Sequence, residues 1–326
     1  MNDQSSNFAV SVIIVSWNAR KYLLQCLASL TGQSCRYPME ILVVDNASSD
    51  GSADAVADSY PDVRLIRNTE NVGFAKANNI GVAASTGRYL CFVNSDVKVL
   101  PDCISRLVEY CEEHTDAGMV GPRILGGDGK LQRSCHGFPG LWNMFCRALA
   151  LDSMFPRIKM FTGYSLSHWP HDSLRPVDIL SGCFWLVRRK ALNQVGLLDE
   201  TFFMYAEDMD WCKRFWAHRW PVVFVPSAEA IHYGGASSSN SPVRFYIERQ
   251  RADLQYWRKH HSRLAVGCFF VISCLHVSLR AAGYSIALIF KRSARQLYQY
   301  KLKRNVSCLR WLISSSFRMQ KIPLSN

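Results

Sequence analysis

The sequence lacks several common signatures. No two of its 12 cysteines have the CxxC spacing, and several lie in apolar stretches such as "YLCFV" and "VISCL". Scattered cysteines of this kind are typical of reduced, buried thiols in the cytosol, and they argue against a zinc site. The stretch "MNDQSSNFAV" has no basic segment followed by an apolar one. We therefore expect no secretory signal and a cytoplasmic protein.

Two nucleotide-binding fingerprints are also missing. No GxGxxG follows the first apolar run, and neither GxxxxGKS nor GxxxxGKT occurs in the chain. These absences weaken a dinucleotide-oxidoreductase or P-loop interpretation. Any nucleotide is therefore bound by residues of another kind.

Acidic residues are scarce in the last quarter of the chain. From Arg244 onward there are 16 Lys and Arg residues against 2 Asp and Glu. The whole chain has 38 basic and 26 acidic residues, so residues 1–243 keep 22 against 24, a net charge of −2. The overall +12 thus belongs to the C-terminal quarter, and its partner should be sought there. No nucleic-acid-binding module accompanies this charge, so we expect no nucleic-acid partner.

The chain is long and apolar, and two kinds of sequence pattern alternate along its first part. At 326 residues and 48% hydrophobic, it can bury the cores of one large or two modest domains. Apolar runs and helical periods alternate through the first hundred residues. The expected strands are 10–17, 39–48, 62–68 and 88–96, and the expected helices 20–33, 48–60 and 73–85. This alternation predicts an α/β fold, with a mostly parallel sheet and helices on both faces.

Polar residues follow three of these expected strands. They are Trp17-Asn18, Asp45-Asn46 and Asn94-Ser95-Asp96. Asn and Asp are ordinary turn residues after any single strand. Because ligands of such sheets bind beyond the carboxyl ends of the strands, three strands that end alike favour a ligand site.

Five stretches together resemble a known family. They are "SVIIVSWN" (11–18), "ILVVDNASSDGS" (41–52), "NVGFAKANNIGVAASTGRYLCFVNSD" (71–96), "SGCFWLVRRKALNQVGLLDETFFMYAEDMDWCKR" (181–214) and "AIHYGGAS" (230–237). In this order they resemble the inverting, nucleotide-sugar-dependent glycosyltransferases of family 2, which have the GT-A fold, and among them the rhamnosyltransferase-like branch. The resemblance covers about 70% of the chain.

The resemblance implies a domain organisation. A GT-A, Rossmann-like domain is expected over 1–243, with a nucleotide-binding half at about 10–100 and an acceptor and catalytic half at about 101–243. A helical, basic extension is expected over 244–326. The segment 136–176 matches no motif, and we interpret it as an acceptor-recognition insertion.

Donor binding is expected at the ends of the first strands. The resemblance assigns nucleotide or donor contacts to Val15, Trp17, Asn18, Asp45, Asn46, Lys76, Asn94 and Ser95. A carboxylate at Asp45 can accept the N3–H of uracil or thymine, so it does not distinguish the two. Lys76 either approaches the diphosphate or is a solvated helix-surface lysine.

A divalent cation, Mg²⁺ or Mn²⁺, is the expected cofactor. A departing diphosphate needs positive charge, and such cations prefer carboxylate oxygen, with imidazole also accepted by Mn²⁺. The resemblance assigns Asp96 and His232 to this metal. Asn94 stands where many relatives carry a first aspartate, which argues against tight metal binding. His232 alternatively has a structural role, although the glycines and serines of 234–239 favour phosphate binding.

The stretch "FFMYAEDMDWCKRFW" (202–216) is expected to carry the general base. If 204–217 is helical, Asp208, Trp211, Cys212 and Phe215 share one face. The resemblance places the base in its Glu-Asp pair, and we assign Asp208 to that role and Glu207 to hydrogen bonding. Asp210 is expected to cap the helix or to pair with Lys213 or Arg214.

Upstream of this helix, the loop at Ser181 and Gly182 is expected on the acceptor side. Trp185, in the strand that follows, either stacks on a sugar or fills the core, and we favour the core. The predicted reaction transfers a sugar from dTDP-rhamnose or a UDP-hexose, with inversion, to a hydroxyl of a glycan acceptor in cell-surface polysaccharide synthesis. The alternatives are an inactive scaffold on the same fold and a nucleotidyltransferase.

The segment from Leu264 to Phe290 is mostly apolar and has basic flanks. It is long enough for a bilayer, which needs about 20 residues, but Arg280 near its middle is costly there. Basic flanks on both sides favour two cytoplasmic ends. We therefore expect in-plane or re-entrant helices at the inner membrane surface, which suits a polyprenyl-diphosphate-linked acceptor. A single span and an ordinary helical domain are the alternatives.

Overall fold

The computed structural model describes residues 8–32, 35–235, 242–290 and 292–318. Residues 236–239 of the glycine- and serine-rich stretch lie outside this set. The chain divides into two compact units, one of residues 1–138 and 169–240 and the other of 139–168 and 241–326. Residues 139–168, in the middle of the expected insertion, therefore belong with the C-terminal helices.

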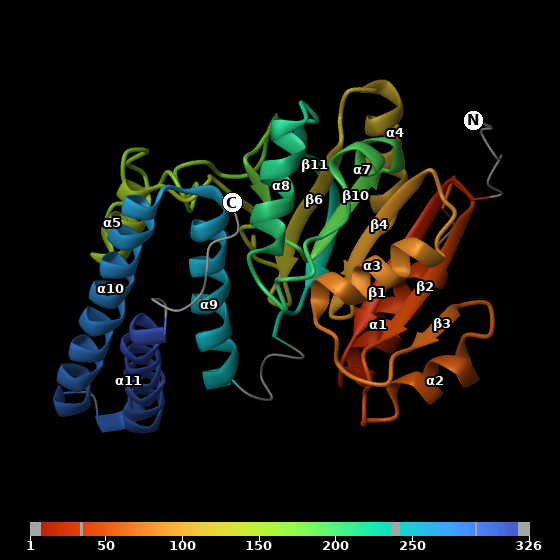
Figure 1. Ribbon diagram of the computed structural model, residues 1–326. Coiled ribbons are helices and arrows are strands. Elements are labelled where there is room, and N and C mark those ends of the chain that lie inside the picture. The colour runs from red at the N-terminus through yellow and green to blue at the C-terminus, as the bar shows by residue number, and fades with distance from the viewer. Residues whose placement is uncertain (1–7, 33–34, 236–241, 291, 319–326) are drawn as a thin grey trace. The chain divides into compact units, whose positions relative to one another are not determined.

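The first unit is built on a nine-stranded mixed sheet (Figure 1). Its path is β3-β2-β1-β4-β10-β6-β11-β5, and β8 pairs with β11 outside this path. A two-stranded sheet pairs β7 with β9. The strands are β1 (Val10–Ser16), β2 (Met39–Asp45), β3 (Arg64–Arg67), β4 (Tyr89–Asn94), β5 (Val97–Val99), β6 (Met119–Gly126), β7 (Cys135–His136), β8 (Arg175–Pro176), β9 (Ile179–Leu180), β10 (Phe184–Arg188) and β11 (Val222–His232).

The strand–helix alternation predicted for the first hundred residues is confirmed. The strands β1, β2, β3 and β4 all run parallel. Between them come α1 (Arg20–Thr31), α2 (Ser52–Ser59) and α3 (Phe74–Ala84). Each expected element is present with slightly shorter bounds, because helix and strand ends give way to turns that the apolar pattern does not mark.

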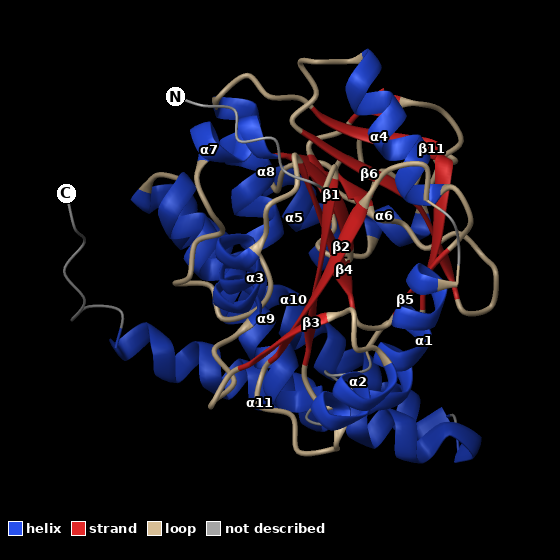
Figure 2. Cartoon of the chain, turned by 90° about the vertical axis from the view of Figure 1, so that its right-hand side faces the viewer, coloured by secondary structure: helices blue, strands red, loops and turns tan. Residues whose placement is uncertain are grey.

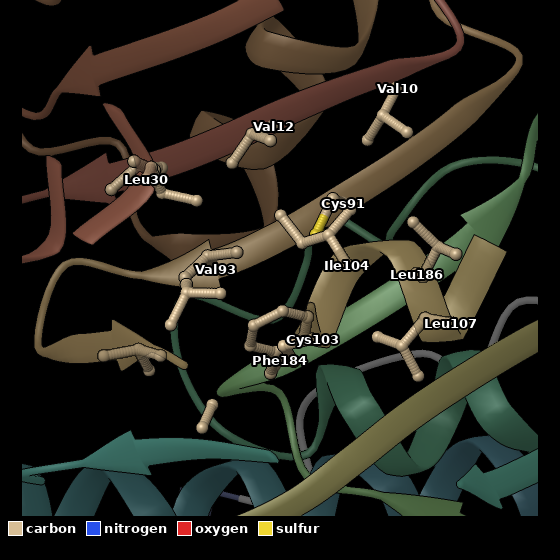
Figure 3. Packing of buried hydrophobic residues seen from close by; sticks show 14 of the residues in the cluster. Val10, Val12, Leu30, Cys91, Val93, Cys103, Ile104, Leu107, Phe184 and Leu186 are labelled. Carbon is tan, nitrogen blue, oxygen red and sulfur yellow. The ribbon is translucent and has the colours of Figure 1, made fainter. Parts of the chain in front are cut away.

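Both faces of the parallel sheet are covered (Figure 2). Side chains of a strand alternate between faces. On one face of β1, Val10, Val12 and Ile14 join the cluster formed with α1 and with α4 (Cys103–Glu113), part of which Figure 3 shows. On the other face, Ile13 contacts α3 so closely that a Cβ built at Gly81 would lie 2.4 Å from its Cγ2. Gly81 thus allows α3 to pack directly on β1.

The second half of this unit carries the antiparallel strands and two helices. The strand β10 pairs antiparallel with β4 and is followed by α7 (Arg189–Val195). The helix α8 (Glu207–Ala217) rests on an aromatic cluster in which Trp211 packs edge-on against Phe92, Trp185 and Phe215 at 5.3–5.4 Å. All four side chains are buried. The expected core position of Trp185 is therefore confirmed.

The second unit is helical. Its elements are α5 (Leu141–Ala148), α6 (Leu151–Met154), α9 (Pro242–His260), α10 (Arg263–Phe290), a short 3₁₀ turn (Arg292–Ala294) and α11 (Arg295–Arg318). The helix α10 packs against α5, α9 and α11. Among the described residues, α10 is the one helix long and apolar enough to cross a membrane.

The cysteines are all unpaired and mostly buried. All twelve lie in described parts of the chain and none forms a disulfide. Nine are buried, and Cys268 on α10 is exposed. Burial raises the pKa of several of these thiols, Cys111 to about 12 among them, so they are packing groups at neutral pH.

Candidate active site

The polar residues that follow β1, β2 and β4 meet at one edge of the sheet. In the parallel register, Ser16 lies opposite Asp45, and Val15 lies opposite Asn94. The amide of Asn46 donates to the carbonyl of Ser16 at 2.8 Å, which joins the two strand ends. The sequence prediction that these strand ends come together is therefore confirmed for Asp45, Asn46 and Asn94.

Asp45 presents a buried carboxylate with unused capacity. Its Oδ2 accepts the amide of Ser48 at 3.0 Å. Its Oδ1 is buried and accepts no hydrogen bond from the described residues, and the hydroxyl of Ser16 beside it is in the same state. Buried polar atoms are usually paired, so an orphaned acceptor next to an orphaned hydroxyl indicates a place for a ligand's donor and acceptor. Ser16 was not among the predicted site residues, although a serine that ends a β-branched run was a usable signal.

Asn18 and Asn46 hold loops together. The amide of Asn18 donates to the Ser48 hydroxyl at 3.0 Å, and its side-chain oxygen accepts the Ser49 amide at 2.7 Å. Asn18 has φ +50°, a left-handed conformation that asparagine tolerates. The Asn46 side chain donates to Asn71 and accepts from the amide of Val72. Since these side chains are satisfied by the protein, they position the edge of the site.

Asp96 and His232 contact each other across the sheet. Val97 of β5 lies opposite His232, the last residue of β11. The imidazole Nε2 of His232 lies 3.2 Å from Oδ1 of Asp96, and the Tyr233 amide donates to the Asp96 carbonyl at 3.0 Å. The Nδ1 of His232 is buried without a partner among the described residues. The two residues expected to serve the metal are thus adjacent.

The donor set of this pair fits a divalent cation. Two adjacent ligands of an octahedral ion are separated by roughly 3 Å when each bond is about 2.1 Å. The observed 3.2 Å between His232 Nε2 and Asp96 Oδ1 is close to that value. No third His, Cys, Asp or Glu joins them in the described part of the chain. A cation held here would therefore need its other ligands from substrate or water, in line with the missing carboxylate at Asn94.

The remaining donor-side predictions lie around this edge. Ser95 is buried, whereas Val15, Trp17 and Asn94 are partly exposed. Lys76 lies in the first turn of α3 and is exposed. Its exposure is compatible with both expected roles, contact with the diphosphate and a solvated position on the helix surface.

The helix α8 places Glu207 and Asp208 at its first two positions. The preceding residues, Tyr205 and Ala206, have φ +70° and +63°. Non-glycine residues with positive φ are costly and concentrate at functional sites. The turn buries Glu207, whose Oε2 has no partner among the described residues, and leaves Asp208 partly exposed.

The electrostatics of this pair separate its two acids. Burial raises the pKa of Glu207 well above its usual range, and the adjacent Asp208 and Asp210 carboxylates raise it further. Burial and the neighbouring carboxylates thus favour the protonated form of Glu207 relative to an exposed glutamate. Asp208, whose Oδ1 accepts the Met209 amide at 2.8 Å, is more exposed to solvent.

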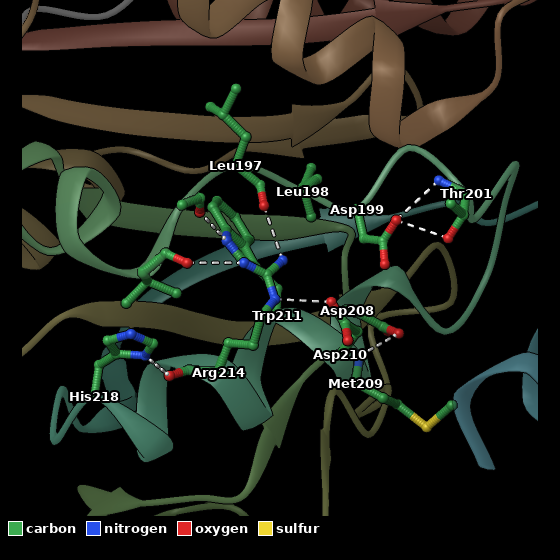
Figure 4. A network of polar contacts seen from close by, with 12 residues as sticks. Leu197, Leu198, Asp199, Thr201, Asp208, Met209, Asp210, Trp211, Arg214 and His218 are labelled. Carbon is green, nitrogen blue, oxygen red and sulfur yellow. Dashed lines mark hydrogen bonds and ion pairs between the residues drawn. The ribbon is translucent and has the colours of Figure 1, made fainter. Parts of the chain in front are cut away.

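A buried ion pair fixes α8 in place (Figure 4). Arg214 Nε donates to Oδ2 of the fully buried Asp210 at 2.9 Å, which confirms one of the two pairings expected for Asp210. The same guanidinium donates to the carbonyls of Val195 and Leu197 at 3.0 and 2.8 Å. Because these carbonyls belong to the last residue of α7 and to the loop after it, Arg214 ties α8 to the end of α7 and to that loop.

A second set of contacts joins this loop region to α3. The side chain of Asn79 donates to the carbonyl of Leu198 and accepts its amide, at 2.9 and 3.1 Å. The Phe203 carbonyl accepts the amide of Phe74 at 2.7 Å. Gly73, with φ +88°, makes that approach possible. The turn before Glu207 is thus anchored to the donor-side half, which periodicity alone did not reveal.

The candidate base Asp208 and the candidate metal ligand Asp96 both act electrostatically on the buried thiol of Cys183. Burial raises the pKa of Cys183 to about 12, and the negative charges of Asp96 and Asp208 also raise it. Both carboxylates therefore lie within electrostatic range of Cys183. On the acceptor side, Ser181 donates its amide to the Ser134 carbonyl at 2.7 Å, and a Cβ at Gly182 would lie 3.2 Å from the Trp185 ring.

Comparisons with known proteins show what the chain is similar to. A model of the family described as glycosyl transferase family 2 matches residues 11–196. N-acetylglucosaminyl-diphospho-decaprenol L-rhamnosyltransferase of Mycobacterium tuberculosis is 32% identical over 262 residues, which cover 77% of this chain and 84% of that protein. The dTDP-rhamnosyl transferase RfbF of Shigella flexneri is 27% identical over 287 residues, 84% of this chain and 88% of that one.

A solved structure shares the fold. The mannosyltransferase PcManGT of Pyrobaculum calidifontis, in complex with GDP-mannose and Mn²⁺, superposes with a TM-score of 0.54 at 19% identity. The match covers 94% of this chain and 88% of that structure. The predicted GT-A fold, with its mixed sheet and helical C-terminal extension, is therefore confirmed.

Proposed function

The chain belongs to glycosyl transferase family 2, and we propose that it moves a sugar, with inversion, from a thymidine or uridine diphosphate donor to a hydroxyl of a lipid-linked glycan. The observation that carries this proposal is the presence of three chemically distinct groups in the first unit. These are an orphaned carboxylate oxygen at Asp45, the Asp96–His232 pair, and the Glu207-Asp208 pair at the start of α8.

The nucleotide base is proposed to bind at Asp45. The Oδ1 of this buried carboxylate is open to the N3–H of uracil or thymine, and the Ser16 hydroxyl beside it can pair with a neighbouring base or ribose oxygen. A charge-assisted hydrogen bond in a dry setting favours a base with an N3–H over one without it. Asn18 and Asn46 keep the two loops around Asp45 in register.

The diphosphate is proposed to leave toward Asp96 and His232. These residues would hold Mg²⁺ or Mn²⁺, which supplies positive charge that stabilises the departing diphosphate. The Asp96 carboxylate, just before β5, and the imidazole of His232, at the end of β11, would orient that site. The ammonium of Lys76 and the backbone amides at the start of α3 would add further positive charge for the diphosphate.

Asp208 is proposed as the general base. In one displacement the acceptor hydroxyl transfers its proton to Asp208, the acceptor oxygen bonds to the anomeric carbon, and the bond from that carbon to the diphosphate oxygen breaks. Attack opposite the leaving group inverts the anomeric configuration. Burial raises the pKa of Glu207, which favours its protonated form, and in that form Glu207 is proposed to donate a hydrogen bond to the acceptor or to the Asp208 carboxylate.

The names of two relatives support the proposed substrates. One is named for rhamnosyl transfer to N-acetylglucosaminyl-diphospho-decaprenol and the other for dTDP-rhamnosyl transfer. We therefore put dTDP-rhamnose first among donors, with UDP-hexoses second, and a polyprenyl-diphosphate-linked glycan as acceptor. Such an acceptor places the enzyme at the cytoplasmic face of the membrane, in a pathway of cell-surface polysaccharide synthesis.

A donor panel tests the proposal. Purified protein is incubated with dTDP-rhamnose, UDP-hexoses and GDP-mannose, with Mg²⁺ or Mn²⁺ and a lipid extract, and nucleoside diphosphate release is followed. We expect release from one thymidine or uridine donor, with a glycolipid product of inverted configuration by NMR. Transfer of the nucleotide, with release of sugar phosphate, would identify a nucleotidyltransferase. No donor-dependent release by folded protein would favour the scaffold alternative.

A further inference from the structure

The segment 154–160 of the helical unit exposes large apolar side chains in a row. Met154, Phe155, Ile158 and Met160 are 64%, 42%, 43% and 60% exposed. Between them lie two exposed cations, Arg157 and Lys159. Single exposed apolar residues are ordinary. Four within seven residues, interleaved with basic ones, are typical of a surface that contacts a membrane or another protein.

An aromatic residue stands beside this segment. Trp142 of α5 is half exposed, and its indole Nε1 donates to the carbonyl of Met160 at 2.9 Å. The rings of Phe155 and Phe161 lie 5.6 Å apart and stiffen the loop between them. Indole rings with one apolar and one hydrogen-bonded side are enriched at lipid–water boundaries.

The helix α10 in the same unit has an outward face of matching chemistry. Its exposed apolar residues recur at helical spacing and fall within an arc of about 100° for 3.6 residues per turn. They are Leu264, Cys268, Val271, Leu279, Ala282, Ile286, Ile289 and Phe290. Apart from Arg263 at its first position, no charged side chain of α10 is exposed. We call this set the outer face of α10.

Two polar residues of α10, His276 and Arg280, lie outside this face and are partly buried. Arg280 donates to the carbonyl of Arg147 in the last turn of α5 at 3.3 Å, a favourable place for a cation. Burial and the Arg280 and Arg147 charges lower the pKa of His276 to about 4, so this imidazole is neutral. Figure 1 shows α5 beside α10. The Arg147 carbonyl that accepts from Arg280 belongs to α5.

From this arrangement we propose that segment 154–160 and the outer face of α10 form a docking surface for an anionic lipid membrane, on which α10 lies in the plane. A helix of 28 residues extends about 42 Å. Lying flat, it places its apolar arc among acyl chains and keeps Arg280 on the protein. Exposed basic residues of the same unit, among them Arg157, Lys159, Arg263 and Arg295, are available to the headgroups.

A second copy of this chain fits the surface less well. Pairing two such surfaces would bring Arg157 and Lys159 of each copy together, and like charges in a desolvated interface are unfavourable. Anionic lipid neutralises them instead. The lipid-linked acceptor of the proposed function gives this docking a purpose, but docking is measured without any transfer reaction.

Vesicle flotation of the full chain tests the proposal. We expect the protein to float with phosphatidylglycerol-containing vesicles and to stay at the bottom with pure phosphatidylcholine. Replacing the four apolar residues by serine (Met154→Ser, Phe155→Ser, Ile158→Ser, Met160→Ser) should weaken partitioning about tenfold or more, because each inserted methylene contributes. The matched control, Leu174→Ser with Leu197→Ser, changes half-exposed leucines of the other unit and should bind as the native chain does.

Charge and orientation are tested separately. Arg157→Glu with Lys159→Glu should lose about tenfold or more on anionic vesicles. Cys268, the exposed cysteine of the outer face, provides a site for an environment-sensitive thiol probe. Its emission should shift to the blue on anionic vesicles and not in the serine variant.

Four results would overturn this docking model. The first is equal flotation on neutral and anionic vesicles, and the second is unchanged binding in both the serine and the glutamate variants of segment 154–160. The third is unshifted emission of the probe at Cys268. The fourth is resistance to alkaline carbonate extraction, which would indicate a spanning helix. Patch-dependent dimers by light scattering, without flotation, would assign the surface to a second copy. None of these readouts involves sugar transfer. A negative docking result therefore leaves the proposed function standing, and a negative transfer assay leaves the docking model standing.

Discussion

The imidazole of His232 lies 3.2 Å from the carboxylate of Asp96, although 136 positions separate them in the sequence. The antiparallel pairing of β5 with β11 produces this contact, because it sets Val97 opposite His232. A strand end and the turn after another strand thus combine into a two-ligand site. The first prediction concerns this pair.

Replacing His232 by alanine should weaken Mn²⁺ binding in the presence of UDP by about tenfold or more. The reason is that the described residues offer no further protein ligand to replace the imidazole. Titration of free Mn²⁺ by electron paramagnetic resonance measures this without turnover. His114→Ala, on the exposed end of α4, is the matched control. Unchanged metal and donor affinity in His232→Ala would remove His232 from the site.

Replacing Asp45 by alanine should weaken binding of UDP by about 10- to 100-fold, the range for a lost hydrogen bond to a charged group. Calorimetry with UDP and with N3-methyl-UDP gives the sharper result. The native protein should prefer UDP, and the variant should bind the two alike. A preference that survives the mutation would mean that the base is read elsewhere.

Glu207→Gln should change how stability depends on pH. The folded pKa of Glu207 is raised, so its stabilising contribution is complete below the unfolded value near 4.5 and is lost as pH rises toward the folded value. Native protein should therefore lose stability above about pH 4.5 relative to the glutamine variant. Thermal melts of both from pH 5 to 8 measure the difference. Parallel curves would show that Glu207 ionises normally.

Arg214→Ala should destabilise the fold by about 3–5 kcal/mol, because it leaves the buried Asp210 carboxylate unpaired. The carbonyls of Val195, at the end of α7, and of Leu197, in the loop after it, also lose their donor. Urea unfolding of the single variant and of Arg214→Ala with Asp210→Ala separates these effects. The double variant should recover part of the loss. Equal stability of the single variant and native protein would mean that the ion pair contributes little.

The sequence was sufficient for the elements of the first hundred residues and for the edge at which they end. Buried parallel strands are continuous apolar runs, and the helices between them keep a clear period, so β1, β2, β3 and β4 follow from local pattern. The strand ends then place Asp45, Asn46 and Asn94 together without further information.

The remainder depends on contacts between distant segments. Nothing local to Gly73 or Asn79 indicates that they anchor the turn before Glu207. The sequence also left open whether Asp210 pairs with Lys213 or with Arg214. The assignment of 139–168 to the helical unit was also hidden, since its apolar residues read as part of an insertion. Such features arise from long-range packing, which periodicity does not encode. The roles assigned to individual site residues stay predictions.

The measurement that tests the account most directly is turnover by Asp208→Asn with the donor that the native chain accepts. An amide cannot take the acceptor proton, so nucleoside diphosphate release should fall by about 10²- to 10⁴-fold while donor affinity is kept. Asp62→Asn, exposed before β3, is the matched control and should react as the native chain does. Near-normal turnover in Asp208→Asn would contradict the assignment of the base and the mechanism built on it.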